Sequence, residues 1–351
     1  MVSIIGPADG VDGVDGVDGV DGVDGVDGVA LEGGGMATPA FRPVGISPHL
    51  KEDNGTWPGN KWPPTFPIKK IGDRPAALHE IFGTLRVDAG PIPPFARRAW
   101  SPRHFAIAVL SEFVRAQIPD DTGAPQTWTS INVAGPLDNH PQGHPLAGKH
   151  VLSGKTLEDE LQELVELIEY RRGVLSEALM QRDRMLDYWR GLLTFSRESH
   201  PATFELARAA AHVGQFMAVH FKWSFQFPRP SQLAPALMPP IDPPGHASYP
   251  SGHATEAYLV SAALEQVMPD VAHEDPPQFA SPVPDTVNAL DRIAERVARN
   301  REVLGVHYPR DSAAGKDLAA KTLPYFRACP LIHALEVEAA SEWPIAPPIG
   351  P

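Results

Sequence analysis

The amino-acid sequence predicts an all-α protein whose helices are connected by long, proline-rich loops. Three observations lead to this prediction. First, apolar residues recur at steps of three and four in several segments after residue 100, as they do along one face of a helix. Second, proline accounts for 39 of 351 residues, about twice its ordinary share. Third, residues 37–98 are rich in Pro, Gly and Trp, which favours irregular chain with a few short strands at most.

Six segments carry the helical pattern. The first begins near Pro102 and ends near Gln117. The second, 156–195, has a leucine stripe that indicates core, and Gly173 is expected to break it into two helices. The third begins at Pro201, because proline is allowed in a first helical turn, and it ends before Pro228. The remaining segments span about 254–268, 285–304 and 312–327, and Gly305 is expected to end the second of these helices.

Composition also divides the chain into parts. Residues 1–35 are an acidic tail with seven Asp-Gly pairs in an Asp-Gly-Val repeat, which we expect to be disordered. Residues 36–98 are the irregular segment, which we expect to pack on the core. Residues 99–330 carry the helical patterns, and residues 331–351 are assigned to a C-terminal tail.

Composition narrows the classes of function. The formal net charge of −13 argues against nucleic-acid binding, so a local cluster of Lys and Arg becomes more informative. The single cysteine, Cys329, excludes an intramolecular disulfide framework and a Cys-rich metal site. No apolar run reaches the roughly 18 residues that predict a transmembrane helix, and residues 1–5 lack the features of a signal peptide. The default expectation is therefore a cytoplasmic protein without a membrane partner.

Three histidines, His140, His144 and His150, lie in the predicted loop from residue 119 to residue 155. Three histidines in one loop could hold a metal ion, but their spacings fit no zinc pattern. We therefore expect them to be solvated.

Two basic residues lie at the end of the third helix and just beyond it. Lys222 continues a stripe of small residues from Ala207 to Ala218, so it is expected on an inward face. A lysine there is costly unless it meets an anion, forms a salt bridge or reaches solvent. Arg229 follows after six residues, and the prolines on either side of it fix its reach.

Two Gly-His pairs, ending at His246 and His253, lie within ten residues. The second belongs to Pro-Ser-Gly-His at 250–253, which opens a predicted helix. The backbone N–H groups of Ser251, Gly252 and His253 therefore point outward at the positive end of the helix dipole, which suits an anion. Ser251 is also a good N-cap, and capping alone is sufficient to explain it.

A third group of candidate site residues begins in the last turn of the helix predicted at 285–304 and continues beyond it. Arg301 lies on the apolar stripe of that helix, where it either forms a buried ion pair or clamps an anion. His307 comes after five further residues and can act as acid, base, nucleophile or ligand. Asp311 lies four positions later, where its carboxylate can accept a ring N–H of His307 and fix the tautomer.

These residues resemble the three-part signature of the vanadium-dependent haloperoxidases and the type 2 phosphatidic acid phosphatase superfamily. The signature reads Lys-six residues-Arg-Pro, Pro-Ser-Gly-His, and Ser-Arg-five residues-His-three residues-Asp, and all three parts occur here in order. One position departs from it, because Asn300 stands where the family usually has serine. The resemblance covers residues 200–320 strongly and 156–195 loosely, and it does not extend to residues 1–100.

The resemblance implies a helical bundle that holds one oxyanion in a catalytic domain at 99–330. In the haloperoxidases the oxyanion is vanadate, so the implied metal is vanadium bonded to His307. His253 would contact the apical oxygen, and the implied catalytic residues are Lys222, His253, His307 and Asp311. The implied oxyanion-binding residues are Lys222, Arg229, Ser251, Gly252 and Arg301. His246 would lie beside the oxyanion, where the family pattern associates histidine with bromide oxidation; an exposed loop histidine is the alternative.

Three hypotheses follow from this pattern. The first is a haloperoxidase of the bromoperoxidase-like branch, with vanadate as cofactor and hydrogen peroxide, halide (bromide or iodide favoured) and a small organic molecule as substrates. The second is a soluble acid phosphatase that hydrolyses phosphate esters without a cofactor, with His307 as nucleophile and His253 as general acid. The third is a non-catalytic oxyanion-binding protein, which His253 argues against, because simple binding does not require it. The sequence leaves homo-oligomerisation open.

Overall fold

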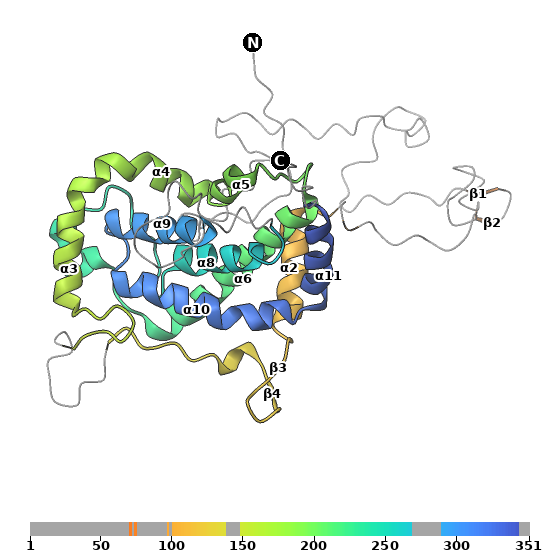
Figure 1. Cartoon of the computed structure of the whole chain (residues 1–351), viewed down its shortest axis with the longest axis horizontal. Coiled ribbons are helices and arrows are strands. Elements are labelled where there is room, and N and C mark those ends of the chain that lie inside the picture. The colour runs from red at the N-terminus through yellow and green to blue at the C-terminus, as the bar shows by residue number, and fades with distance from the viewer. Residues whose placement is uncertain are drawn as a thin grey trace, which may run out of the picture. The chain divides into compact units, whose positions relative to one another are not determined.

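The computed structural model describes residues 100–137, 148–268 and 289–343, together with residues 70–71, 74–75 and 97. Contacts divide the chain into two compact units, one formed by Met1–Val26 and Arg97–Pro351 and the other by Asp27–Ala96. In the second unit, β1 (Lys70–Ile71) pairs antiparallel with β2 (Arg74–Pro75). The described part of the first unit is mostly helical (Figure 1), so the prediction of a helical protein is confirmed at that level. The acidic tail lies outside the described residues.

The α-helices of the first unit follow one another as α2 (Pro102–Phe113), α3 (Leu157–Glu166), α4 (Arg171–Arg184), α5 (Asp187–Leu193), α6 (Pro201–Phe225), α7 (Pro230–Leu233), α8 (Gly252–Leu264), α9 (Ala289–Val303), α10 (Pro309–Arg327) and α11 (Pro330–Ser341). Short 3-10 helices occur at η5 (Trp128–Ser130), η6 (Leu167–Tyr170) and η7 (Pro235–Leu237). The strands β3 (Ile118–Pro119) and β4 (Pro125–Gln126) form a two-stranded antiparallel pair.

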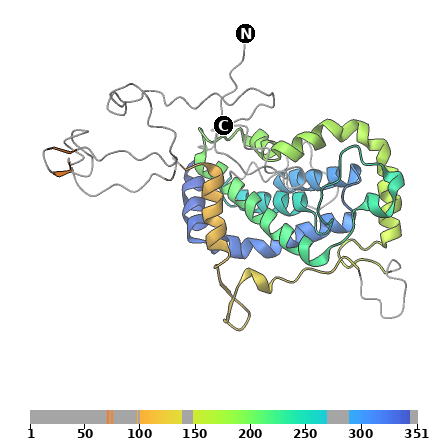
Figure 2. The ribbon, with the colours of Figure 1, turned by 180° about the vertical axis from the view of Figure 1, so that it is seen from behind.

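Helix α8 is the central helix of this unit. It packs against α6, α9 and α10, and Figures 1 and 2 show it between these helices from both sides. Most of its side chains are buried, which fits its Ala-rich sequence. Two glycines let neighbouring helices approach closely. A Cβ at Gly214 of α6 would lie 2.9 Å from the Glu256 Cα, and one at Gly315 of α10 would lie 2.8 Å from the Ser251 carbonyl oxygen.

Helix α6 begins at Pro201, as the sequence predicts. Its first N–H groups are satisfied from a distant part of the chain, because the Glu342 carboxylate accepts from the backbone N–H groups of Ala202 at 2.8 Å and Thr203 at 2.9 Å. Glu342 follows α11 directly, and α11 packs against both α6 and α2. The cap therefore ties the end of the described chain to the start of a core helix.

Helix α9 buries its apolar stripe and ends before Gly305, which has a positive φ of 73°. A non-glycine residue would be strained in that conformation, so the predicted role of Gly305 in ending the helix is confirmed. Arg171, the first residue of α4, donates from Nε to the Val303 carbonyl oxygen at 2.9 Å. This contact satisfies part of the C-terminal end of α9.

Several helix boundaries differ from the predicted ones. The break expected at Gly173 is wrong: Gly173 lies inside α4, and the segment turns instead at η6 and again between α4 and α5. An exposed glycine within a helix costs only about 1 kcal/mol, so it does not have to end one. Helix α2 is shorter than predicted, whereas α8 and α10 start at Gly252 and Pro309, before the positions expected. Residues 285–288 of the fifth predicted helix lie outside the described residues.

Two further expectations are corrected. Residues assigned to a C-terminal tail form α11, in which Ile332, Leu335 and Ala339 are buried. His150, expected to be solvated, is fully buried, because its ring nitrogens contact backbone groups and the Tyr249 hydroxyl. His140 and His144 lie outside the described residues.

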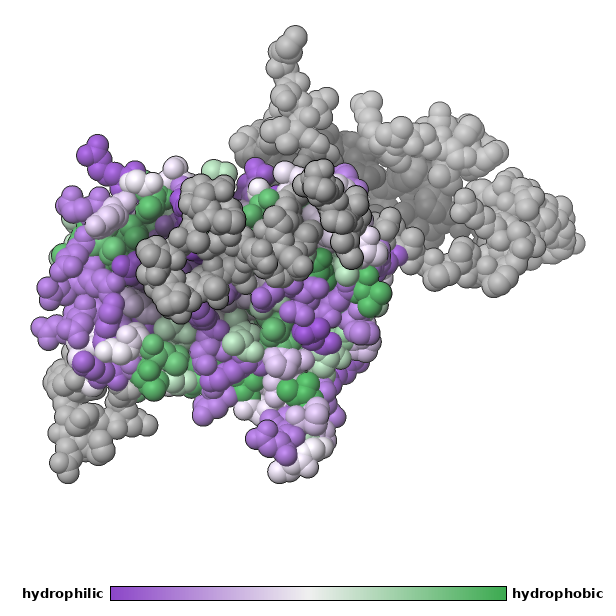
Figure 3. All heavy atoms as spheres, viewed as in Figure 1, coloured by the Kyte–Doolittle hydropathy of each residue, from purple (hydrophilic) through white to green (hydrophobic). Residues whose placement is uncertain are grey.

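No helix within the described ranges is long and apolar enough to span a bilayer. On the face seen in Figure 3, hydrophobic residues occur in small groups among hydrophilic ones. The apolar side chains instead gather in one large core cluster that draws on α2, α3, α5, α6, α8, α9, α10 and α11.

Candidate active site

The candidate site is built around the turn that leads into α8, residues 246–251, which we call the 246–251 turn. Ser251 is the N-cap of α8, and its Oγ accepts from the Ala254 N–H at 3.3 Å, so the predicted capping role is confirmed. The Ser251 N–H donates to the Asp311 carbonyl oxygen at 2.9 Å, which joins the starts of α8 and α10. Gly252 and His253 are buried in the first turn of α8.

Lys222 reaches this turn from the last turns of α6. Its side chain is buried, with 2% exposed, and Nζ donates to the carbonyl oxygens of Ala247 at 3.0 Å and Ser248 at 2.9 Å. Both of these acceptors are backbone carbonyl oxygens of the 246–251 turn. The predicted inward orientation of Lys222 is confirmed.

Arg229, at the start of α7, holds the same turn from another side. Its Nε donates to the His246 carbonyl oxygen at 3.0 Å, and one terminal nitrogen lies 3.1 Å from His246 Nδ1. The other terminal nitrogen donates to the Val306 carbonyl oxygen at 2.9 Å and lies 3.0 Å from His307 Nε2. The guanidinium, 2% exposed, thus links His246 to His307.

The neighbours of His307 determine its tautomer. Nδ1 lies 2.8 Å from Asp311 Oδ2, and Nε2 lies 3.0 Å from a guanidinium nitrogen of Arg229. A guanidinium can only donate, so Nε2 must accept with its lone pair. The proton therefore sits on Nδ1 and is donated to Asp311. A neutral imidazole with its lone pair on Nε2 is the form that can attack an electrophile or bind a metal centre once the contact with Arg229 is exchanged.

Asp311 is fully buried in the first turn of α10, and Oδ2 is its principal acceptor. That oxygen receives hydrogen bonds from Ser248 Oγ at 2.5 Å, His307 Nδ1 at 2.8 Å and the Tyr308 N–H at 3.1 Å. Burial by itself raises the pKa of Asp311, but the hydrogen bonds from these three donors, that from His307 first, lower the pKa below its usual value of 3.8. The carboxylate therefore stays ionised and holds the His307 ring in place.

Arg301 and Asn300 face a different neighbour. Arg301 is fully buried on α9 and donates to the Ala178 carbonyl oxygen of α4. Asn300 Nδ2 donates to Gln181 Oε1 at 2.9 Å, also on α4. The residue that departs from the family pattern thus lies against α4. The convergence of Arg301 with Lys222 and Arg229 on one anion stays a prediction.

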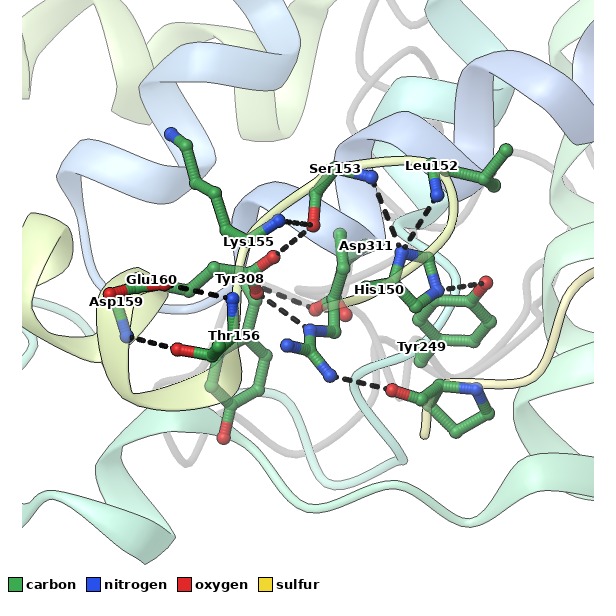
Figure 4. Close-up of polar contacts among 12 residues, drawn as sticks. His150, Leu152, Ser153, Lys155, Thr156, Asp159, Glu160, Tyr249, Tyr308 and Asp311 are labelled. Atoms are coloured by element: carbon green, nitrogen blue, oxygen red, sulfur yellow. Dashed lines mark hydrogen bonds and ion pairs between the residues drawn. The ribbon is translucent and has the colours of Figure 1, made fainter. Parts of the chain in front are cut away.

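A second buried polar cluster lies against the start of α10 (Figure 4). Arg310 Nε donates to Glu160 Oε2 of α3 at 2.7 Å, and its Nη1 donates to the Pro136 carbonyl oxygen at 2.7 Å. Burial raises the pKa of Glu160, while the hydrogen bond from Ser153 and the charge of Arg310 act in the opposite direction. Because Arg310 precedes Asp311 in the chain, this pair braces the turn that carries the catalytic candidate.

Sequence reasoning missed several of these residues. Ser248, Glu160 and Arg310 contact the site or its support, yet none of them stands out by spacing or charge pattern. Their partners lie far away in the chain, at separations that no local pattern reveals. For Ser248, the one available sign is its place two residues before the Pro-Ser-Gly-His stretch.

Within the described ranges, no three His, Cys, Asp or Glu side chains gather in a way that could hold a metal ion among them. A vanadate bonded to one histidine does not need such a group, because most of its contacts would be hydrogen bonds to its oxygens. Comparison with models of protein families and with curated proteins finds no match for the chain.

Proposed function

We propose that this protein is a vanadate-dependent haloperoxidase that uses hydrogen peroxide to oxidise halide, with bromide and iodide favoured over chloride, to hypohalous acid. A small organic molecule would then receive the halogen. One observation carries the proposal: the buried His307 ring is held by Asp311 at Nδ1 and directs its Nε2 lone pair toward Arg229.

The residues around His307 fit an oxyanion. Nε2 offers a lone pair, which bonding to vanadium requires. Arg229 already contacts Nε2, so an oxyanion bonded there would lie within reach of its guanidinium. Lys222 supplies a second buried cation at the adjoining turn. The N-terminal end of α8 adds Ser251 and the Gly252 N–H as further donors, together with the positive end of the helix dipole.

Bound vanadate would supply an electron-poor centre that activates hydrogen peroxide toward attack by halide. The residues of this chain would then perform separate tasks. Lys222, Arg229 and Arg301 would hold the oxygens and balance their negative charge. His253, at the start of α8, would take up or release a proton at its ring nitrogen. Asp311 would keep the proton of His307 on Nδ1, and His246 would act through its contacts with Arg229.

The same geometry supports a second candidate, a soluble acid phosphatase. A neutral histidine that carries its lone pair on Nε2 is also what nucleophilic attack on phosphorus requires. In that reaction His307 would form a bond to phosphorus as the P–O bond to the alcohol breaks, and His253 would protonate the leaving alcohol. Water would then attack phosphorus and release phosphate from His307, and no cofactor would be needed. The two candidates share every residue of the site, so only the reaction distinguishes them.

The experiment that tests the proposal compares both reactions in one preparation. The purified chain is incubated with orthovanadate, and bromide oxidation by hydrogen peroxide is followed with a halogen acceptor. A parallel sample without vanadate is assayed with p-nitrophenyl phosphate, and His307→Ala is the matched control in both assays. Vanadate-dependent bromide oxidation that His307→Ala abolishes is the expected result. Phosphate-ester hydrolysis alone would favour the phosphatase, and anion binding without either activity would favour the binding protein.

A further inference from the structure

Ser248 contacts two residues of the candidate site that lie far apart in the sequence, Lys222 and Asp311. Its side chain is fully buried in the 246–251 turn. Its backbone oxygen accepts from Lys222 Nζ at 2.9 Å, and its backbone N–H donates to the Phe227 carbonyl oxygen at 2.8 Å. Its Oγ lies 2.5 Å from Asp311 Oδ2. One small residue thus touches the lysine and the carboxylate at once.

The direction of the side-chain hydrogen bond follows from the partners. An ionised carboxylate only accepts, so the Ser248 hydroxyl donates to Asp311 Oδ2. Ser248 Oγ also lies 3.5 Å from His307 Nδ1, but Asp311 Oδ2 is nearer to that nitrogen, at 2.8 Å. The N–H of His307 is therefore directed to Asp311, and both side-chain donors meet on one carboxylate oxygen.

We propose that Ser248 is a positioning residue for His307 and acts through Asp311. A carboxylate can rotate about its Cβ–Cγ bond, and the donors around it decide where its oxygens point. Two of the donors to Oδ2, His307 and Tyr308, lie directly before α10, within four residues of Asp311 in the chain. Ser248 is the donor that comes from the turn before α8. Its hydroxyl therefore fixes the carboxylate, and with it the His307 ring, relative to α8 and Lys222.

The kinetic consequence rests on the proposed function. The oxyanion would bond to His307 Nε2 while groups at the start of α8 hold its oxygens. His307 and the start of α8 must therefore keep a fixed distance from each other. Without the Ser248 hydroxyl, the carboxylate loses its donor from the 246–251 turn, so Asp311 holds the Nδ1 side of the ring less firmly, while Arg229 still contacts Nε2. Removing partners of this kind from a liganding histidine typically lowers metal affinity or activity about 10- to 100-fold.

Ser248→Ala removes the hydroxyl and adds no atoms. The first readout is the proton NMR signal of His307 Nδ1–H in the protein without added anion, assigned by its absence in His307→Gln. The second is kcat for bromide oxidation with vanadate present, together with the Kd of vanadate. Ser261→Ala is the matched control, because Ser261 is another buried serine whose hydroxyl donates to a backbone carbonyl oxygen, that of Leu290 at 2.8 Å. Ser248→Cys, whose thiol is only a weak hydrogen-bond donor, takes the place of Ser248→Ala should that variant fail to fold.

The expected result is a shifted or broadened Nδ1–H signal in Ser248→Ala, with kcat or vanadate affinity lowered about 10- to 100-fold, while Ser261→Ala keeps the parent's signal and rate per folded molecule. A Nδ1–H signal in the folded variant identical to the parent's would overturn the inference, and so would losses equal to those of Ser261→Ala. The NMR readout needs neither vanadate nor turnover, so it decides on Ser248 even if the parent oxidises no halide.

Discussion

Gly315→Ala offers a direct test of how α8 and α10 are packed. A Cβ at this position would lie 2.7 Å from the Ala254 Cβ, 2.8 Å from the Ser251 carbonyl oxygen and 3.0 Å from the Thr255 backbone nitrogen. Two of these neighbours are backbone atoms of the first turn of α8, so no side chain can rotate to relieve the contact. The first two distances are shorter by about 0.6 Å or more than the 3.4 Å at which ordinary contact begins. The two helices must therefore move apart.

The size of the effect follows from this overlap. Forcing a methyl group into a well-packed interface lowers the free energy of unfolding by about 1 to 3 kcal/mol, and the better helix propensity of alanine offsets up to about 1 kcal/mol of that. A domain of this size loses about 2 to 4 °C of Tm for each kcal/mol. Because Ser251 carries the start of the candidate site, anion binding should weaken together with stability.

The assay is thermal unfolding with and without orthovanadate, and Gly173→Ala is its matched control. Gly173 also lies within a helix, but a Cβ there would have nothing within 4 Å. That variant should gain about 0.5 to 1 kcal/mol from helix propensity and bind the anion as the parent does. If Gly315→Ala were as stable as the parent, or lost stability while binding vanadate normally, the close packing of α10 on the α8 terminus would not be what shapes the site.

Four further predictions concern single residues of the site. His307→Ala should abolish both vanadate-dependent bromide oxidation and any phosphate-ester hydrolysis, measured in the two assays described above. Replacing Arg229 by Gln should weaken vanadate binding by about 1.5 to 3 kcal/mol, the scale of a charged hydrogen bond, measured by titration calorimetry. His246→Ala should lower bromide turnover at mildly acid to neutral pH while vanadate stays bound, and the parent should oxidise chloride poorly, both seen in steady-state rates. The pKa of Asp311 lies below 3.8, so its contribution to stability is present above the unfolded value and is lost as pH falls below about 4; acid unfolding of the parent and of Asp311→Asn measures that loss.

Each of these predictions has a result that contradicts it. Retained turnover in His307→Ala would remove that residue as the anchor. A parent-like pH profile in His246→Ala, or chloride oxidation equal to bromide oxidation in the parent, would remove the assignment of His246. Asp311→Asn is expected to flatten the stability curve at acid pH, and a curve parallel to the parent's would show that another carboxylate is responsible. Arg229→Gln with unchanged affinity would mean that the oxyanion is held without its guanidinium.

The sequence alone predicted those helix ends and caps that depend on a few neighbouring residues. Pro201 at a first helical turn, Ser251 as N-cap and Gly305 after a helix each depend on backbone geometry within a few residues, and all three are found as predicted. The inward position of Lys222 followed from a four-residue period, which is equally local.

Features that depend on distant partners could not be predicted in this way. His150 is buried because Gly135 and Tyr249 surround it, and Tyr249 is 99 residues away. Arg301 contacts Ala178, which lies 123 residues before it. The α-helix is interrupted at η6, whose sequence contains neither proline nor glycine, and η6 packs against α9. In each case tertiary packing decides what the local sequence leaves open.

The hydrogen bonds of Arg229 have a thermodynamic consequence for any ligand of this site. A free arginine side chain loses about 2 kcal/mol of rotamer entropy when it is fixed, but here His246, Val306 and His307 already hold it. That loss belongs to folding, so an arriving oxyanion exchanges partners at an ordered side chain. The oxyanion must replace the imidazole lone pair as the acceptor of one guanidinium N–H. Its affinity therefore reflects the free energy of the new contact minus that of the contact between Arg229 and His307 that is lost. Selectivity among anions of equal charge should then depend on how well their shape replaces the lost contact.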